Sequence, residues 1–123
     1  MKFMQKIIFI SIFGLQSQLA LAHAHLLESH PANSEILTQP PIEVSAKFSE
    51  EIELAMSKIV VEDLTSHEVV SAAKSLKDKN TLVVTLKPLK NENKIYQVSW
   101  KAVTKDSHTM KGVFKFTFKP SEK

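Results

Sequence analysis

Apolar and polar residues alternate with a period of two along most of the chain. The clearest example is the segment 42–48, in which every second residue is apolar and the residues between them are Glu, Ser and Lys. A similar alternation recurs in four later segments, at 58–62, 82–86, 96–102 and 113–119. Because successive side chains of a strand point to opposite faces, each segment is expected to form a strand with one buried face.

Turn signals separate these segments and indicate a β-sandwich. They are Pro40-Pro41, Asp78-Lys79-Asn80 and Asn91-Glu92-Asn93. With a first strand expected around 24–29 and a weaker one near 69–74, the count is about seven strands in roughly 100 residues. This pattern predicts an all-β fold, an immunoglobulin-like Greek-key β-sandwich. The acidic segment 50–54 fits either a short helix or an edge strand.

The beginning of the chain has the features of a secretory signal peptide. Lys2 and Lys6 precede an almost wholly apolar run at 7–15, and Ala20 and Ala22 supply the small residues that a signal peptidase reads. The apolar run is too short to cross a hydrocarbon core of about 30 Å as a helix. We therefore expect cleavage of the signal, export to the periplasm and a soluble mature protein.

The position of the cut decides which residue becomes the amino terminus. Cleavage after Ala22 divides the chain into a signal peptide, 1–22, and a single mature domain, 23–123. A cut after Ala24 also satisfies the small-residue pattern. In both cases a histidine becomes the first residue.

The composition excludes several classes of function. The chain has no cysteine, which removes disulfides, thiolate metal sites and cysteine nucleophiles. All 16 basic residues are lysine and the formal net charge is only +3, which argues against a nucleic-acid reader. The chain contains no Gly-x-Ser-x-Gly motif, and the carboxylates Glu50, Glu51 and Glu53 are interpreted as a solvated edge. The composition therefore favours a binding protein and gives no support for an enzyme.

Histidine and aspartate supply the candidate metal ligands. After a cut behind Ala22, His23 offers two nitrogens from one residue, its free amine and its imidazole. Asp106 and His108 are two residues apart, so their side chains leave the same side of the chain if that segment is extended. Together these groups make three nitrogens and one oxygen. This donor set suits a tetragonal Cu(II) ion best, although zinc also accepts such ligands.

A local alternative uses the amino terminus alone. In the sequence His23-Ala24-His25, the amine, two deprotonated amides and the third-residue imidazole could hold Cu(II) in a square plane. We favour the site that includes Asp106 and His108, because amide deprotonation would remove backbone donors that a first strand needs for pairing. Whether His25 contributes is left open.

The order and spacing of several motifs resemble the CopC family of periplasmic copper-binding proteins, with its PcoC- and YobA-like branches. The resemblance extends over essentially the whole mature chain. Its elements are His23-Ala24-His25-Leu26, Ser29-His30-Pro31-Ala32, the segment 41–50, Tyr96-Gln97-Val98-Ser99-Trp100, and Asp106-Ser107-His108 followed by Gly112 and Phe114-Lys115-Phe116.

The resemblance implies a small β-sandwich that holds Cu(II) through its amino-terminal His, an Asp and a second His. Matched residue by residue, these ligands are His23, Asp106 and His108. The expected function is a periplasmic Cu(II) carrier or buffer in copper homeostasis or resistance, not an enzyme. Some members carry a Met-rich Cu(I) site, which Met56 and Met110 alone do not make. The implied partner is a CopD-type copper importer of the inner membrane, and the protein is expected to be a monomer.

Two other functions compete with this expectation. Copper monooxygenases that use a histidine brace also combine an amino-terminal His with a second His on a β-sandwich, but Asp106 would add a charged ligand to that plane. A metal-free immunoglobulin-like interaction module is the third possibility, and it would bind no Cu(II).

Overall fold

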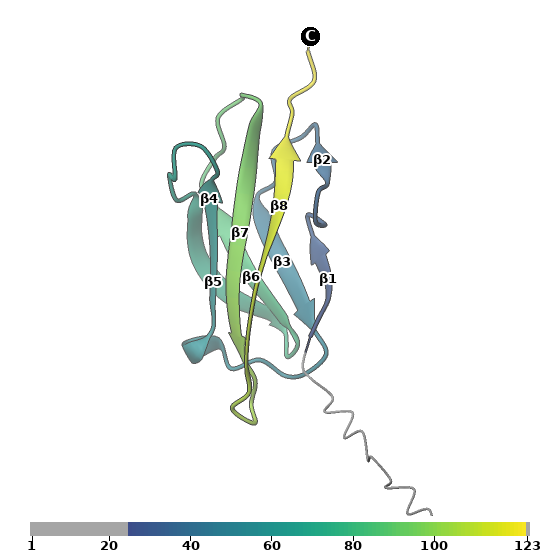
Figure 1. The fold of residues 1–123 in the computed structure, drawn as a ribbon, viewed down its shortest axis with the longest axis vertical. Helices are drawn as coiled ribbons and strands as arrows, with labels where there is room; N and C mark the ends of the chain where they lie inside the picture. The colour runs from purple at the N-terminus through teal and green to yellow at the C-terminus, as the bar shows by residue number, and fades with distance from the viewer. Residues whose placement is uncertain (1–24, 123) are drawn as a thin grey trace, which may run out of the picture.

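Two four-stranded sheets make up the domain in the computed structural model, which describes residues 25–122 (Figure 1). The strands are β1 (Leu26–His30), β2 (Ile36–Leu37), β3 (Glu43–Phe48), β4 (Lys58–Asp63), β5 (Ser71–Asp78), β6 (Thr81–Leu86), β7 (Lys94–Val103) and β8 (Thr109–Phe118). One short 3-10 helix, η1 (Leu54–Met56), lies between β3 and β4. The all-β prediction is confirmed, whereas the predicted signal peptide lies outside the described residues.

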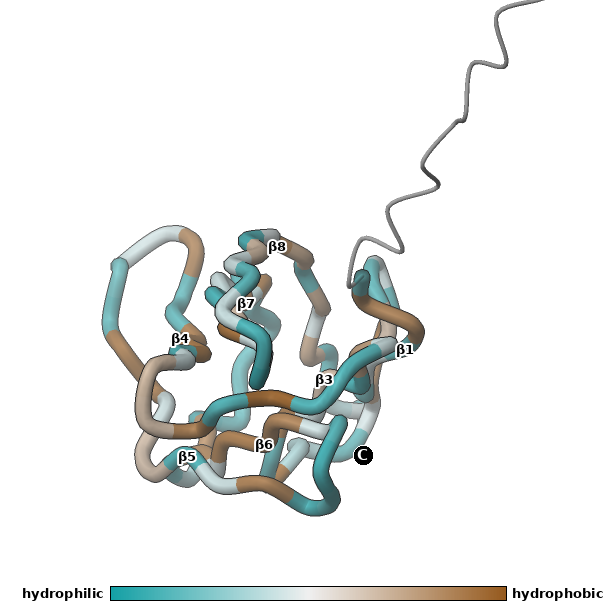
Figure 2. The backbone as a smooth tube through the Cα atoms, turned by 90° about the horizontal axis from the view of Figure 1, so that it is seen from below, coloured by the Kyte–Doolittle hydropathy of each residue, from teal (hydrophilic) through white to brown (hydrophobic). Residues whose placement is uncertain are grey.

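The strand order shows that the chain passes repeatedly from one sheet to the other. One sheet has the order β1-β3-β6-β5 and the second has the order β2-β8-β7-β4. Viewed from one end, the two sheets form two layers (Figure 2). The predicted sandwich is thus confirmed, with one strand more than expected: the two-residue β2, which pairs in parallel with β8.

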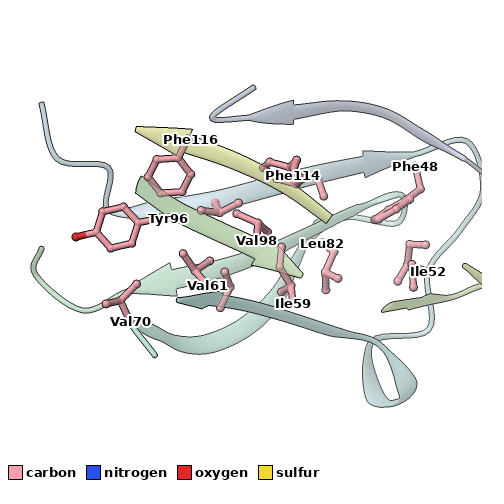
Figure 3. Close-up of a cluster of buried hydrophobic side chains, with 14 of the residues drawn as sticks. Phe48, Ile52, Ile59, Val61, Val70, Leu82, Tyr96, Val98, Phe114 and Phe116 are labelled. Atoms are coloured by element: carbon pink, nitrogen blue, oxygen red, sulfur yellow. The ribbon is translucent and has the colours of Figure 1, made fainter. Parts of the chain in front are cut away.

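The alternating pattern of the sequence builds the core between the sheets. In β3, Val44, Ala46 and Phe48 are fully buried, and in β8 Phe114 and Phe116 point inward in the same way. Figure 3 shows side chains from both sheets meeting in one cluster. Burying each large apolar side chain contributes about 1.5–3 kcal/mol, so this cluster supplies the stability that no disulfide provides.

The acidic segment after β3 is neither of the two simple alternatives expected from the sequence. Ile52 is fully buried and forms an isolated antiparallel bridge with Thr104, and the short helix η1 follows it. The segment therefore crosses the end of the sandwich, anchored by a buried side chain, before β4 begins.

Trp100 fills the space above a glycine of the neighbouring strand. Trp100 of β7 lies opposite Gly112 of β8, and a Cβ atom on Gly112 would come within 2.3 Å of the indole ring. The indole also contacts Phe48 edge to face, with ring centroids 5.0 Å apart. Gly112 is thus the residue that lets the indole pack against the end of β3.

Three segments that are distant in the sequence meet at one end of the sandwich. The start of β1, the end of β3 and the β7–β8 hairpin all lie at the bottom of Figure 1. Backbone hydrogen bonds link them: Ser49 N donates to His25 O over 3.0 Å, and Lys105 N donates to Glu51 O over 3.0 Å. Among residues 25–122, no helix is long and apolar enough to span a bilayer.

Candidate metal centre

The β7–β8 hairpin brings Asp106 and His108 together in a tight turn. Thr104 N donates to His108 O over 2.8 Å, and Ser107 N donates to Thr104 O over 2.9 Å. Ser107 has a φ of 70°, in the left-handed region, which turns the chain between the two candidate ligands. The segment is therefore not extended, in contrast to the arrangement considered from the sequence. The two side chains nevertheless meet, with Asp106 Oδ2 and His108 Nδ1 3.3 Å apart.

Thr104 holds this turn through its side chain. The residue is 2% exposed, and its hydroxyl donates a hydrogen bond to Asp106 Oδ1. The hydroxyl oxygen of Thr104 also accepts a hydrogen bond from His108 N at 3.0 Å. The hydrogen bond from Thr104 lowers the pKa of Asp106 below its usual value, with a smaller contribution from the charge of His108. Asp106 is thus a carboxylate at neutral pH, available as an anionic ligand.

Glu50 joins these two residues, although its sequence context predicted a solvated edge. Ligand atoms of Glu50, Asp106 and His108 all lie within 4.8 Å of one another. Glu50 is partly buried, whereas Asp106 and His108 are exposed. Within residues 25–122, this is the group of three metal-ligating side chains that the fold assembles.

The crossing segment after β3 fixes the position of Glu50. On the C-terminal side of Glu50, Ile52 pairs with Thr104, and Glu53 N donates to Val103 O over 2.8 Å. The side chain of Lys105 also reaches Glu53, with Nζ 2.7 Å from Oε2. The only sequence signal for Glu50 is its place just after a strongly alternating strand, and that pattern does not reveal which hairpin the strand end approaches.

The first described residue lies beside this group. His25 N donates to Ser49 Oγ over 2.9 Å, next to Glu50 in the chain. His23, the third ligand expected from the sequence, lies outside the described residues, so the structure does not test its place. His25 is exposed, and its backbone N–H, which the local alternative would deprotonate, donates the hydrogen bond to Ser49.

The two remaining described histidines lie elsewhere. His30 Nε2 is 3.3 Å from Glu28 Oε1, at the opposite end of β1 from the candidate site. His67 adopts a φ of 62° in the turn between β4 and β5. Neither belongs to the group of three metal-ligating side chains found within residues 25–122.

The chemistry of the group suits a divalent cation. Two carboxylates and one imidazole at a surface offer oxygen and borderline nitrogen donors, and their negative charge favours a cation over an anion. Three side chains leave coordination positions free, which an amino-terminal histidine would fill with nitrogen donors. Of the three ligands predicted from the sequence, the structure brings Asp106 and His108 together, and Glu50 joins them.

Comparison with known proteins identifies relatives in sequence. A family model described as the CopC domain matches residues 26–119. The chain is 32% identical over 102 residues to Protein YobA of Escherichia coli (strain K12), and the match covers 80% of each protein. It is 30% identical over 99 residues to Copper transport protein CutJ of Bacillus subtilis (strain 168), covering 80% of this chain but only 18% of that protein.

A solved structure supports the same relationship. The crystal structure of PcoC, a methionine-rich copper resistance protein from Escherichia coli, matches with a TM-score of 0.68 and 27% sequence identity. The match covers 79% of this chain and 99% of that one. The fold and the sequence therefore point to one family.

Proposed function

Because this chain belongs to the CopC family, we propose that it is a periplasmic carrier or buffer of copper that binds Cu(II) as its cargo. The names of its relatives, which mention copper transport and copper resistance, support copper as the metal. The observation that carries the proposal is the meeting of Glu50, Asp106 and His108 at the end of the sandwich where the described chain begins.

The proposed ligands are His23, Asp106 and His108, with the signal peptide 1–22 removed. His25 is held against Ser49 by two hydrogen bonds, from His25 N to Ser49 Oγ at 2.9 Å and from Ser49 N to His25 O at 3.0 Å. Two further residues extend at most about 7 Å from His25, and Ser49 directly precedes Glu50 of the metal-ligating group. This reach supports a copper site shared by the amino terminus and the β7–β8 hairpin.

Glu50 is proposed as an additional carboxylate of the site. The amine and imidazole of His23, the imidazole of His108 and one oxygen of Asp106 would fill the four positions of a tetragonal plane. Glu50 lies within 4.8 Å of the other two side chains and approaches from the crossing segment, not from the hairpin. Its role would be an axial contact or a charge that favours the divalent ion.

Binding is proposed to weaken as the pH falls. Cu(II) must displace protons from the free amine, with a reference pKa of about 7.7–8.0, and from imidazole, at about 6.5. Affinity should therefore decrease from about pH 8 downward. With the four planar positions taken by His23, Asp106 and His108 and a further carboxylate beside them, the site favours storage or transfer of the ion over catalysis.

Partner and location follow from the same proposal. Delivery to or from a CopD-type membrane protein is consistent with the Bacillus relative, in which the matching region makes up only 18% of a longer copper transport protein. We place the protein in the periplasm as a monomer.

Electron paramagnetic resonance of the secreted protein with Cu(II), together with mass spectrometry of its amino terminus, tests the proposal. The expected result is a tetragonal signal with three nitrogen donors, from a chain that begins at His23. A variant that keeps one extra residue before His23 should lose the amine donor and bind more weakly. An unchanged signal from that extended variant would contradict the proposed ligand set.

A further inference from the structure

Three lysines form a row across the outer face of the sheet that contains β4, β7 and β8. Lys58 of β4 lies opposite Lys101 of β7, which lies opposite Lys111 of β8. The positions that alternate with these lysines are buried or partly buried, so all three side chains point away from the core. Neighbouring strands are about 4.8 Å apart, and three positive charges therefore share one short line across the sheet.

This row of charge is not compensated within the described part of the chain. No ion pair there involves Lys58, Lys101 or Lys111, whereas Lys94 and Lys105 have carboxylates at 2.6 and 2.7 Å. Like charges directly opposite on a sheet destabilise it. A ligand that supplies negative charge would remove that cost.

The surrounding face is also basic. The outward positions of β4, β7 and β8 include a fourth lysine, Lys115, and a single carboxylate, Glu62. Val60 and Val113, in the next row, are 37% and 59% exposed. Figure 1 shows the three strands side by side, with the β7–β8 hairpin at their lower end.

The composition of this face distinguishes between possible partners. The cores of protein interfaces are rich in aromatic residues and arginine and poor in lysine. The outward positions of these three strands carry no aromatic residue. Lipid phosphates need only point charges at a flat surface, which lysine ammonium groups provide.

We infer that the outer face of β4, β7 and β8 docks reversibly onto the anionic phospholipid headgroups of a membrane. Only the pairs Ala102–Met110 and Val103–Thr109 separate the lysine row from the hairpin that carries Asp106 and His108. Docking therefore holds the candidate metal centre close to the membrane surface. The inference does not depend on copper binding, because the three lysines lie outside the metal-ligating group.

Co-sedimentation of the metal-free, processed protein with phospholipid vesicles tests this inference. Binding is expected to vesicles that contain phosphatidylglycerol, not to vesicles of phosphatidylcholine alone, and it should weaken with added salt. The triple variant Lys58→Gln, Lys101→Gln, Lys111→Gln should lower the partition coefficient on the order of 100-fold. Each single variant should lower it roughly fivefold, which keeps the test valid if the triple variant fails to fold.

The matched control changes the same charge elsewhere. Lys47, Lys77 and Lys87 are exposed on or beside the opposite sheet, and their triple Gln variant should retain most of the binding. Equal losses of vesicle binding in the two triple variants would overturn the inference, because the total charge of the protein and not this face would then determine binding. Equal binding to both vesicle types would overturn it as well. Binding to polyglutamate but not to the vesicles would also overturn it, and would identify an acidic protein surface as the partner.

Discussion

At the scale of single residues, Thr104 connects the core to the candidate metal centre. Its buried hydroxyl forms hydrogen bonds with the side chain of Asp106 and with the backbone of His108. Its backbone forms a β-bridge with Ile52, two residues after Glu50. One residue thus sets the distance between the hairpin and the crossing segment. Groups that orient metal ligands in this way commonly change metal affinity 10–100-fold when they are removed.

The first prediction concerns the histidines. Replacing His23 or His108 by Ala should each lower Cu(II) affinity far more than His67→Ala, since His67 lies in the β4–β5 turn. Competition titration with a chelator of known affinity measures the difference. Equal losses in the three variants would contradict the proposed ligands.

The second prediction separates Glu50 from its neighbour. Glu50→Gln removes a carboxylate from the group with Asp106 and His108, whereas Glu51→Gln changes a side chain whose nearest described partner is Lys79, at 3.8 Å. Cu(II) affinity should fall about tenfold in the first variant and stay near wild type in the second. The same competition titration measures both variants. Equal Cu(II) affinities for Glu50→Gln and Glu51→Gln would contradict a role for Glu50 in the site.

At the scale of elements, the register between β7 and β8 positions both the candidate site and its support. The two strands pair without a shift from Lys94–Phe118 to Val103–Thr109. This register places Gly112 under the Trp100 indole, which packs on Phe48 at the end of β3. The hairpin that carries the ligands is therefore fixed by packing between sheets as well as by its own turn.

The third prediction tests that packing. Gly112→Ala places a methyl group within 2.3 Å of the indole, so the ring must move and the protein should lose about 1–3 kcal/mol of stability. The melting temperature should fall by at least about 4 °C. Thermal unfolding followed by the fluorescence of Trp100, the single tryptophan of the chain, measures it. Val113→Ala, at an exposed neighbouring position, is the control, and an equal melting temperature in both variants would refute the role of Gly112.

At the scale of the whole molecule, the two ends of the sandwich have different chemistry. The candidate metal centre occupies one end, and an ion pair between buried Asp63 and partly buried Lys94 occupies the other (Figure 1). Asp63 is 3% exposed, lies 2.6 Å from Lys94 Nζ and accepts hydrogen bonds from the backbone of Thr65 and Ser66. The hydrogen bond from Lys94 is the main reason that the pKa of Asp63 is lowered to about 2.

The fourth prediction is the pH dependence of stability that this ion pair causes. The pKa of Asp63 is lower in the folded protein, about 2, than its usual 3.8, so its contribution is present above pH 3.8 and is lost as the pH falls toward 2. The loss amounts to about 2 kcal/mol. Denaturant unfolding at several pH values should show a weaker dependence between pH 4 and pH 2 for Asp63→Asn than for wild type.

The control for this prediction is Glu43→Gln, which removes an exposed carboxylate of β3. It should keep the acid dependence of wild type. Identical pH profiles for Asp63→Asn and wild type would contradict the assignment. As the pH is lowered, the copper affinity is expected to decrease at pH values well above 4, before the contribution of Asp63 is lost. Metal release and acid unfolding should therefore be separable in one pH titration.

Local sequence was enough to identify the strands and the faces that they bury. Alternation with a period of two identifies the inward residues of β3, β7 and β8, because side chains of a strand must alternate between two faces. Local sequence also singled out Asp106 and His108 as a local pair, although a tight turn and not the extended segment considered from the sequence brings them together. The resemblance to the CopC family was readable from the same segments and is confirmed.

The meeting of distant segments depends on the packing of the folded domain. Glu50 reaches the hairpin because Ile52 pairs with Thr104, a contact between positions far apart in the chain. The lysine row likewise exists only because β4, β7 and β8 are neighbours in one register. Alternation fixes the face of each strand but not its partner, and the partner is chosen by packing between the sheets, which no local pattern encodes.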